Sequence, residues 1–418
     1  MIEAVLERCA GLDVHQETVV ACVLSGDLNE APKKELRTYG TTTEDLIQLA
    51  NWLVNSGCSH VAMESTGVYW KPIWNVLEAF DFEMLLANAH HIKNLPGRKT
   101  DMKDAEWIAK LLRSGLIEGS FVPSPEVRDL RDLTRYRKKL VYHATAEKNR
   151  IHRLLQDANI KLTTFMSDVF GVSGRLLLQR LVDGEVITIE FLEDNMKGPL
   201  KNKAEQLLQS VNGRIRGHHI QMIRFSWEHL MFLEQTIQQI DQEIYSRLQG
   251  RREAVELLVT IPGVNEQSAS IIIAEIGTDM EQFTNEHALA AWAGVCPGNF
   301  ESAGKKKRTR VRSGNSLLKA ILCECAWAAA RTRNTRLSAR YWSLVKRMGK
   351  KKALVAVAHT ILKIIYHVLH KRQSYIELGA EYLEQYRKDK LERRQTKMIH
   401  ELEAKGFLIT RPASPQPD

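Results

Sequence analysis

The 418-residue sequence lacks several patterns that mark common classes of enzyme. It contains no GxxxxGK[ST] phosphate-binding loop, so an ATP-driven reaction has no support. Its six cysteines form no CxxC pair and have no histidine at metal-ligand spacing, which favours a reduced, cytoplasmic protein without structural zinc. No internal repeat is visible. The first residues lack a basic segment followed by an apolar core, so we expect no signal peptide.

Long apolar runs are also scarce. The most apolar one, Ala353 to Leu369, is interrupted by His359, Lys363 and His367, which argues against a membrane span. Lys and Arg together number 59, against 50 Asp and Glu. This modest excess favours a polyanionic partner such as nucleic acid over an acidic small molecule.

The first 120 residues have the pattern of an α/β domain. Three strands come first, near residues 11–14, 19–24 and 34–39, where apolar and β-branched residues gather. The elements that follow are a helix near 44–55 capped by Thr41 or Thr42, a strand at 60–64, a helix near 69–80, a strand at 83–89 and a helix at 101–115. This order predicts a sheet with helices on its faces.

Four acidic residues of this region stand out. Asp13 lies on the first predicted strand, and Glu64 ends a later, apolar strand. Asp101 and Asp104 are three residues apart at the start of the last helix, so they share one face of it. Taken singly, an exposed turn, a helix cap and the preference of acids for a first helical turn explain them without a ligand. Taken together they favour a site for a pair of Mg²⁺ or Mn²⁺ ions, because hard oxygen ligands suit these ions and buried carboxylates are costly.

The middle of the chain predicts long charged helices. Apolar residues recur near heptad spacing over 127–162, and a second long helix is expected over 220–252, as in an antiparallel or dimeric coiled coil. Many Arg and Lys residues cover the first of these helices. A solvated helical spacer and a nucleic-acid-binding face explain them about equally well. The glycine-rich segment 163–213 is interpreted as a small helical insertion.

A tight turn, Ile261 to Val264, separates two predicted helices in the third region. Pro262 fixes the turn, and Gly263 allows close approach of another backbone. Val264 and the second helix follow. The pattern predicts a helix-hairpin-helix in which the N-terminal N–H groups of the second helix bind DNA phosphates. An ordinary corner between two helices is the alternative.

A glycine- and proline-broken loop then leads to Ser302 and a dense basic run. Such a run is typical of a solvated loop or of a phosphate-binding patch. A serine is a weak nucleophile unless a base, a metal or a positive field activates it, so a plain loop serine is the simpler interpretation of Ser302 from the residues alone. Ser313 and Ser316 are expected to cap the helix at 317–331. The candidate phosphate-binding residues are Lys305, Lys306, Lys307, Arg308, Arg310 and Arg312.

These motifs together resemble one known family. The residues GLDVH at 11–15, ESTGVY at 64–69, KTDMKD at 99–104 and the block IPGV…AEIG…LAAWAGVCPGNFESAGKKKR resemble the 110 family of insertion-sequence transposases, and the ESAGK form is similar to its 1111 subgroup. The resemblance implies a RuvC-like (RNase H fold) domain with a DEDD set of carboxylates over 1–122, a coiled-coil linker over 123–252, and a mostly α transposase domain over 253–400. From its composition, we expect the remaining segment 401–418 to be a tail with a disordered end.

The resemblance also implies a mechanism. It assigns the metal ligands to Asp13, Glu64, Asp101 and Asp104 and the transposase-domain serine to Ser302. It implies a DNA recombinase that works as a dimer or tetramer in the prokaryotic cytoplasm and nucleoid, guided by a non-coding bridge RNA, with a site composed from both ends of the chain. Two alternatives stay open: a RuvC-like junction nuclease in which metal-activated water cuts DNA, and a non-catalytic helix-hairpin-helix DNA-binding protein.

Overall fold

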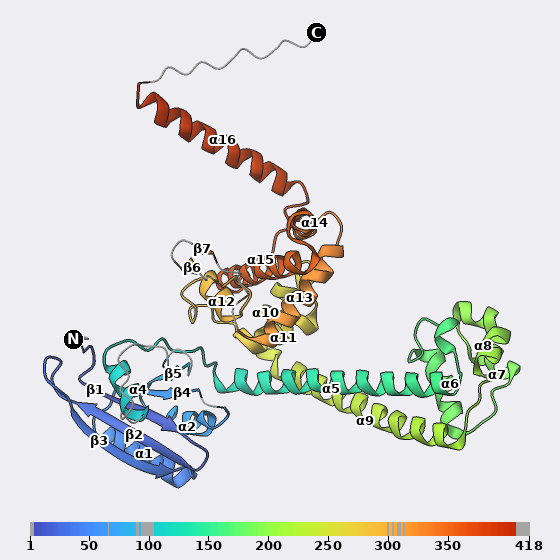
Figure 1. The fold of residues 1–418 in the computed structure, drawn as a ribbon, viewed down its shortest axis with the longest axis horizontal. Helices are drawn as coiled ribbons and strands as arrows, with labels where there is room; N and C mark the ends of the chain where they lie inside the picture. The colour runs from blue at the N-terminus through green and yellow to red at the C-terminus, as the bar shows by residue number, and fades with distance from the viewer. Residues whose placement is uncertain are drawn as a thin grey trace. The chain divides into compact units, whose positions relative to one another are not determined.

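The computed structural model describes residues 4–65, 67–88, 92, 104–298, 301–302, 305–306, 311 and 314–406. The chain divides into two compact units, Met1–Val122 and Pro123–Asp418, and each is described by itself (Figure 1).

Unit 1 is built on a five-stranded sheet of order β3-β2-β1-β4-β5. The first three strands are antiparallel neighbours, and β4 and β5 run parallel to β1. Their bounds are β1 Arg8–Val14, β2 Thr18–Ser25, β3 Lys33–Gly40, β4 His60–Glu64 and β5 Glu83–Ala87. The predicted α/β layer, three strands followed by alternating helix and strand, is confirmed.

Helices cover both faces of this sheet, because side chains along each strand alternate between the two faces. On one face, apolar residues of β1 and β4 such as Leu12 and Met63 pack with α1 (Thr43–Asn55) and α2 (Trp70–Leu77). On the other face, Cys9 and Ala62 pack with α4 (Asp104–Arg113). The hydroxyl of Thr42 accepts a hydrogen bond from the Asp45 amide and caps α1, as one of the two predicted threonines.

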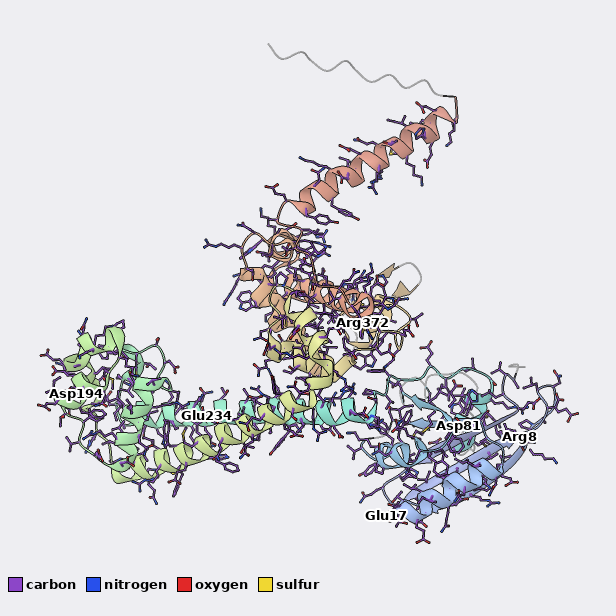
Figure 2. All side chains as sticks on the ribbon, turned by 180° about the vertical axis from the view of Figure 1, so that it is seen from behind. Arg8, Glu17, Asp81, Asp194, Glu234 and Arg372 are labelled. Atoms are coloured by element: carbon purple, nitrogen blue, oxygen red, sulfur yellow. The ribbon has the colours of Figure 1, made fainter. Side chains whose placement is uncertain are left out.

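Unit 2 begins with two long antiparallel helices that lie side by side, α5 (Pro125–Asp157) and α9 (Gly217–Arg247) (Figure 1). Figure 2 labels Glu234 on α9, whose carboxylate pairs with Lys148 of α5 at 3.0 Å and with Arg175 at 2.8 Å. Between the two helices the chain forms several short helices, over the segment interpreted above as a small insertion. Its elements are η1 Leu162–Thr164, α6 Val172–Asp183, α7 Ile189–Asn195, η2 Gly198–Lys203 and α8 Ala204–Val211.

The rest of unit 2 is a helical bundle centred on α15 (Lys350–Lys371), which α10, α12, α13 and α14 contact. The other elements are η3 Gln249–Arg251, α10 Arg252–Val259, α11 Glu266–Ile276, α12 Glu286–Trp292, β6 Glu301–Ser302, β7 Lys305–Lys306, α13 Ser316–Arg331, α14 Arg336–Met348 and α16 Tyr382–Glu403. By length and composition alone, α15 is the one helix of the described residues that could cross a membrane. Half of its most apolar stretch is buried among the other helices, so α15 forms the core of this bundle.

The cap of α13 differs from the prediction. The side chain of Asn315 accepts a hydrogen bond from the Leu318 amide, and Ser316 is the first residue of the helix. Asn is as good a cap as Ser, and the side-chain amide of Asn315 also donates a hydrogen bond to Glu275. Ser313 lies outside the described residues.

Candidate active site

A glycine in β1 sets how closely α4 packs on the sheet. A Cβ atom at Gly11 would collide with the carbonyl oxygen of Ala105 and the amide nitrogen of Ala109 in α4. Two residues earlier on the same strand face, the thiol of Cys9 donates a hydrogen bond to the Ala109 carbonyl at 3.6 Å. The helix therefore runs over β1 in the opposite direction to the strand, with its N-terminal end towards the carboxyl end of β1.

This packing brings three of the four predicted acids to one face of the sheet. Asp13 is two residues beyond Gly11, so it lies on the α4 face. The parallel register of β1 and β4 ends at the pair Leu12 and Met63, and Asp13 and Glu64 are the residues that follow. Asp104 opens α4, one residue before Ala105, at the end of the helix that lies towards Asp13.

The surroundings of these acids are partly polar. One carboxylate oxygen of Asp13, whose side chain is 25% exposed, lies 3.3 Å from Nε2 of His15. Glu64 and Asp104 are half-buried. Asp101 lies outside the described residues. Among the residues that are described, no three Asp, Glu, His or Cys side chains are close enough together to hold a metal ion.

A further acid on α4 is already neutralised. Glu106 accepts hydrogen bonds from Lys110 and from Lys34 of β3, each at 2.8 Å and each on a different carboxylate oxygen. The hydrogen bonds from Lys110 and then Lys34 lower the pKa of Glu106 below its ordinary value. This carboxylate joins α4 to the sheet edge, so Glu106 is not a candidate metal ligand.

The donor set at the carboxyl ends of β1 and β4 consists of carboxylate oxygens. Such a set suits a hard divalent cation such as Mg²⁺ or Mn²⁺ and offers no thiolate to a softer metal. Asp13, Glu64 and Asp104 therefore share a face and a donor chemistry that such a cation prefers, but within the described residues these side chains are not close enough together to hold one.

Ser302 lies on a short hairpin in unit 2. β6 and β7 pair antiparallel, with Ser302 opposite Lys305 and Glu301 opposite Lys306. Pro297 and Val311, which flank the hairpin in the sequence, pair through an isolated antiparallel β-bridge. Of the predicted basic residues, Lys305 and Lys306 lie on β7, whereas Lys307, Arg308, Arg310 and Arg312 lie outside the described residues.

The hairpin returns to the bundle through a tightly packed joint. A Cβ atom at Gly314 would collide with the backbone of Trp292 and Gly294, at the end of α12. The backbone amide of Asn315 then donates a hydrogen bond to the Trp292 carbonyl oxygen at 3.4 Å. The two ends of the Ser302 segment are thus held together by backbone contacts.

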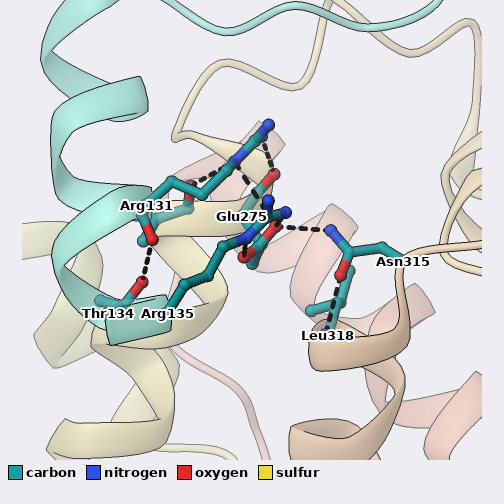
Figure 3. A network of polar contacts seen from close by, with 7 residues as sticks. Arg131, Thr134, Arg135, Glu275, Asn315 and Leu318 are labelled. Carbon is teal, nitrogen blue, oxygen red and sulfur yellow. Dashed lines mark hydrogen bonds and ion pairs between the residues drawn. The ribbon is translucent and has the colours of Figure 1, made fainter. Parts of the chain in front are cut away.

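A fully buried carboxylate, Glu275 of α11, anchors this joint (Figure 3). Arg135 of α5 donates two hydrogen bonds to its two oxygens, at 2.8 and 2.9 Å, and Asn315 donates a short third one. Arg131 lies 3.4 Å from the carboxylate and donates to the carbonyl oxygens of Ala274 and Glu275. We call Glu275, Arg131, Arg135 and Asn315 the Glu275 cluster.

The cluster ties α5, α11 and the start of α13 together. Burial lowers the pKa of Arg131 to about 10, whereas the hydrogen bonds to Glu275 raise the pKa of Arg135. This structural function of Glu275 was not predicted from the sequence. The available signal was one acid within the apolar helix IIIAEI, since a charge in such a helix needs a partner.

The two helices predicted on either side of this turn are present as α10 and α11, and Asn265 caps α11 by accepting a hydrogen bond from the Ser268 amide. Gly263 has φ of +87°, and a Cβ atom there would collide with backbone atoms of Cys325 and Ala329 in α13. Val264 is buried. The close backbone approach at Gly263 is therefore an internal one, to α13. A groove of about 480 Å³ beside the turn is lined by Val264, Asn265 and Ser268 together with Arg137 and Lys138 of α5.

Two family models match different parts of this chain. The family model of the DEDD transposases of the IS110 type matches residues 10–160, and that of the transposase IS116/IS110/IS902 family matches residues 255–342. The first match contains most of β1 and all of β4 and α4, and the second contains most of α10 and all of α11, Ser302 and α13. Together the two matches span more than half of the chain.

Two curated relatives align over most of the chain. The transposase for insertion sequence element IS1111A of Coxiella burnetii is 23% identical over 295 residues, which are 69% of this chain and 72% of the relative. The transposase for insertion sequence element IS1533 of Leptospira borgpetersenii is 24% identical over 327 residues, 76% of this chain and 84% of the relative. With both family models matched in order, the chain belongs to the IS116/IS110/IS902 family of transposases, the DNA-recombining enzymes of insertion sequences.

Proposed function

We propose that this transposase cuts and rejoins DNA with Ser302 as the nucleophile and with Asp13, Glu64, Asp101 and Asp104 as ligands of a divalent cation. One observation carries the proposal: β1, β4 and α4 bring Asp13, Glu64 and Asp104 to the same face at the carboxyl ends of two parallel strands. We also propose that residues 1–122 form a RuvC-like domain, which a coiled-coil linker and a transposase domain follow.

The proposed chemistry conserves phosphodiester bonds. The Ser302 oxygen bonds to phosphorus as it loses its proton, and the bond from phosphorus to the leaving DNA oxygen breaks, so that a hydroxyl is released on one strand. A hydroxyl of the partner strand then attacks the phosphoserine, which restores the serine and joins the new pair of strands. Because each bond broken is replaced by one of the same kind, the reaction needs no nucleotide energy source.

The chain's own groups have separate roles in this scheme. A bound divalent cation would supply Lewis-acid polarisation of the scissile phosphate. Asp13, Glu64, Asp101 and Asp104 would hold it. The basic residues around β7, from Lys305 to Arg312, would hold the phosphates and stabilise the negative charge that develops on phosphorus.

The remaining parts of the proposal concern partners. The resemblance described above supports a non-coding guide RNA that pairs with donor and target DNA, action as a dimer or tetramer, and a place in the prokaryotic cytoplasm and nucleoid. Sequencing the RNA that copurifies with the full chain tests the guide directly. RNA from the ends of the insertion sequence is the expected result, and random cellular RNA would contradict it.

A recombination assay in cells, with the element ends and target on plasmids, tests the catalytic assignments. Ser302→Ala and Asp13→Asn should each abolish recombination, since one removes the nucleophile and the other a metal ligand. Ser316→Ala is the matched control, because this serine comes just after the joint and is only the first residue of α13. Full activity of Ser302→Ala would show that Ser302 is not the nucleophile. Full activity of Asp13→Asn would show that Asp13 is not an essential metal ligand.

A second mechanism shares the same carboxylates. In a RuvC-like junction nuclease a metal-activated water would attack phosphorus, and Ser302 would be a bystander. This alternative predicts that Ser302→Ala still cuts DNA in vitro, whereas Asp13→Asn does not. The proposed serine mechanism predicts that both variants fail to cut.

A further inference from the structure

Charge is strongly segregated in the last third of the chain. Between Glu324 and Glu377 the sequence contains twelve Lys and Arg and three His, but no Asp or Glu. The chain as a whole has nearly as many acids as bases. The segment forms the end of α13, all of α14 and all of α15, which contact one another (Figure 1).

Most of these cations have no acid to neutralise them. Arg331, Arg333, Lys346 and Arg347 are exposed, and so are Lys350 to Lys352. Within the described residues, none of these side chains forms an ion pair. Lys363 differs, because it pairs with Glu286 of α12 at 3.2 Å.

Three of the lysines occupy an unfavourable place. Lys350, Lys351 and Lys352 form the first turn of α15, which contains no acid and has no side-chain cap. The positive end of the helix dipole repels cations there. Three adjacent lysines at a helix start therefore do not stabilise the free protein, and an external anion would offset their repulsion.

Large aromatic side chains are exposed beside these cations. Trp327 is 42% exposed and Trp342 is 55% exposed. The ring of buried Tyr341 lies between them, with centroids 6.2 Å from Trp327 and 5.2 Å from Trp342. The Arg331 guanidinium lies 4.5 Å from the centroid of Trp327. Since Lys346 follows Trp342 by one helical turn, we call Trp327, Arg331, Trp342 and Lys346 the basic-aromatic patch.

We propose that the basic-aromatic patch binds an unpaired nucleic-acid strand. Exposed indole rings offer faces on which bases stack, and the neighbouring cations contact phosphates. A duplex hides the faces of its bases, so it can use the cations but not the rings. The inference rests on the proposed function, in which strand exchange and RNA pairing leave strands unpaired. It adds to that function a contact site that is separate from the Ser302 hairpin and the carboxylates.

The charges favour nucleic acid over a protein partner. Lysine is depleted at the centre of protein interfaces, whereas the rings of this patch have unpaired cations immediately around them. A strand carries one phosphate per nucleotide and so complements a segment that has no acid between Glu324 and Glu377.

The test is a binding titration of the full chain in a chelating buffer, in which no strand cleavage takes place. The probes are fluorescent oligouridylate RNA, oligothymidylate DNA and a DNA duplex of matched length. Trp342→Ala should weaken binding of both unpaired strands about tenfold and change duplex binding less than about twofold. Trp342→Phe, which keeps a stacking face, should recover most of the affinity.

One further variant serves as a control, and another tests the contribution of charge. Tyr142→Ala is the matched control, because this aromatic ring on α5 is 73% exposed and lies outside the patch. Lys346→Glu leaves both rings in place and should also weaken binding of an unpaired strand about tenfold, by placing a negative charge near its phosphates. Equal losses for RNA and DNA support recognition of bases and phosphates alone. A larger loss for RNA supports an additional contact to the ribose hydroxyl.

Three outcomes would overturn the inference. The first is a Trp342→Ala protein that binds unpaired strands as tightly as Tyr142→Ala. The second is a Trp342→Ala loss that is as large for the duplex as for the strands. The third is a change in sedimenting mass with unchanged strand binding, which would make the patch a protein contact. Because catalysis takes no part, these results are independent of the recombination assay on Ser302 and Asp13.

Discussion

Two basic regions of unit 2 use their charges in opposite ways. On α5, Arg135 is bound to Glu275, Arg137 to Asp241 and Lys138 to Glu324. On α14 and the start of α15, the exposed cations of the described residues have no such partners. Lys and Arg make up 9 of the 33 residues of α5 and 7 of the 17 residues of 336–352, so both places are strongly basic. What separates a structural cation from one available to a ligand is the acid that the fold brings to it.

The two regions also differ in what substitution should do. Paired and buried charges set the stability of the unit, because removing one partner leaves the other uncompensated. Exposed and unpaired charges contribute little to stability and remain available for binding. The predictions below test this division, from the largest expected effect to the smallest.

The largest effect is expected at Glu275. Glu275→Gln removes a fully buried carboxylate from Arg131 and Arg135 and should lower the free energy of unfolding by about 3–5 kcal/mol. The measurement is the urea midpoint of the full chain, followed by circular dichroism. Glu266→Gln is the control: this carboxylate pairs with Arg252 at 2.8 Å but is 63% exposed, so its loss should cost less than about 1 kcal/mol. Equal midpoints for the two variants would contradict the distinction.

A matched pair of arginines compares the two regions directly. Arg137→Ala removes a two-pronged contact with Asp241 and should cost about 1.5–3 kcal/mol. Arg347→Ala removes an exposed cation of α14 and should change the free energy of unfolding by less than about 0.5 kcal/mol. Urea titrations of the two proteins side by side are the check. If Arg347→Ala proves the more damaging, Arg347 has a structural role that the comparison denies.

The lysines of α15 should appear in the salt dependence of binding. Replacing Lys350, Lys351 and Lys352 by Ala should reduce the slope of log affinity against log salt for a single strand by up to about 2, since each phosphate contact contributes about 0.7. The same change should leave stability unchanged or slightly improved, because cations leave a helix N-terminus. An unchanged slope, measured over a series of salt concentrations, would show that these lysines do not contact phosphates.

The smallest effect concerns pH and unit 1. The pKa of Glu106 is held below its ordinary value by Lys110 and Lys34, so its ion pairs stabilise the fold above the unfolded-state pKa, which is about 4.5. This stability is lost as the pH falls through the lower folded-state pKa. Between about pH 6 and about pH 3, the melting temperature of the wild type should therefore fall more steeply than that of Glu106→Gln. Parallel melting curves would contradict this role of Glu106.

Local patterns predicted the elements well. The β-branched runs placed β1 to β3, and helical spacing placed α1, α4 and the long pair α5 and α9, because these signals lie within one element. The expectation that Asp13, Glu64 and Asp104 lie on neighbouring elements also followed from the order of strands and helices. That they share one face depends on Gly11, whose contact with Ala105 and Ala109 of α4 spans nearly 100 residues of chain.

Long-range pairing is what the sequence could not supply. Glu275 and Arg135 are 140 residues apart, and no local pattern selects this arginine from the others on α5. The same holds for Gly263, whose close contact is with α13 in the same unit. Asn315 replaced the expected serine as the cap of α13, since its side chain both caps the helix and contacts Glu275. Partners distant in sequence decide each of these cases.

The central claim is that Ser302 forms a covalent bond to DNA, and a trapped adduct tests it most directly. The full chain is incubated with Mg²⁺, guide RNA and element DNA carrying a nick next to the cleavage site, so that the released fragment diffuses away and rejoining fails. Peptide mass spectrometry after nuclease digestion should then find a nucleotide phosphate on Ser302 in the wild type and none in Asp13→Asn. Cut DNA with no adduct on Ser302 would contradict the account and assign the attack to water.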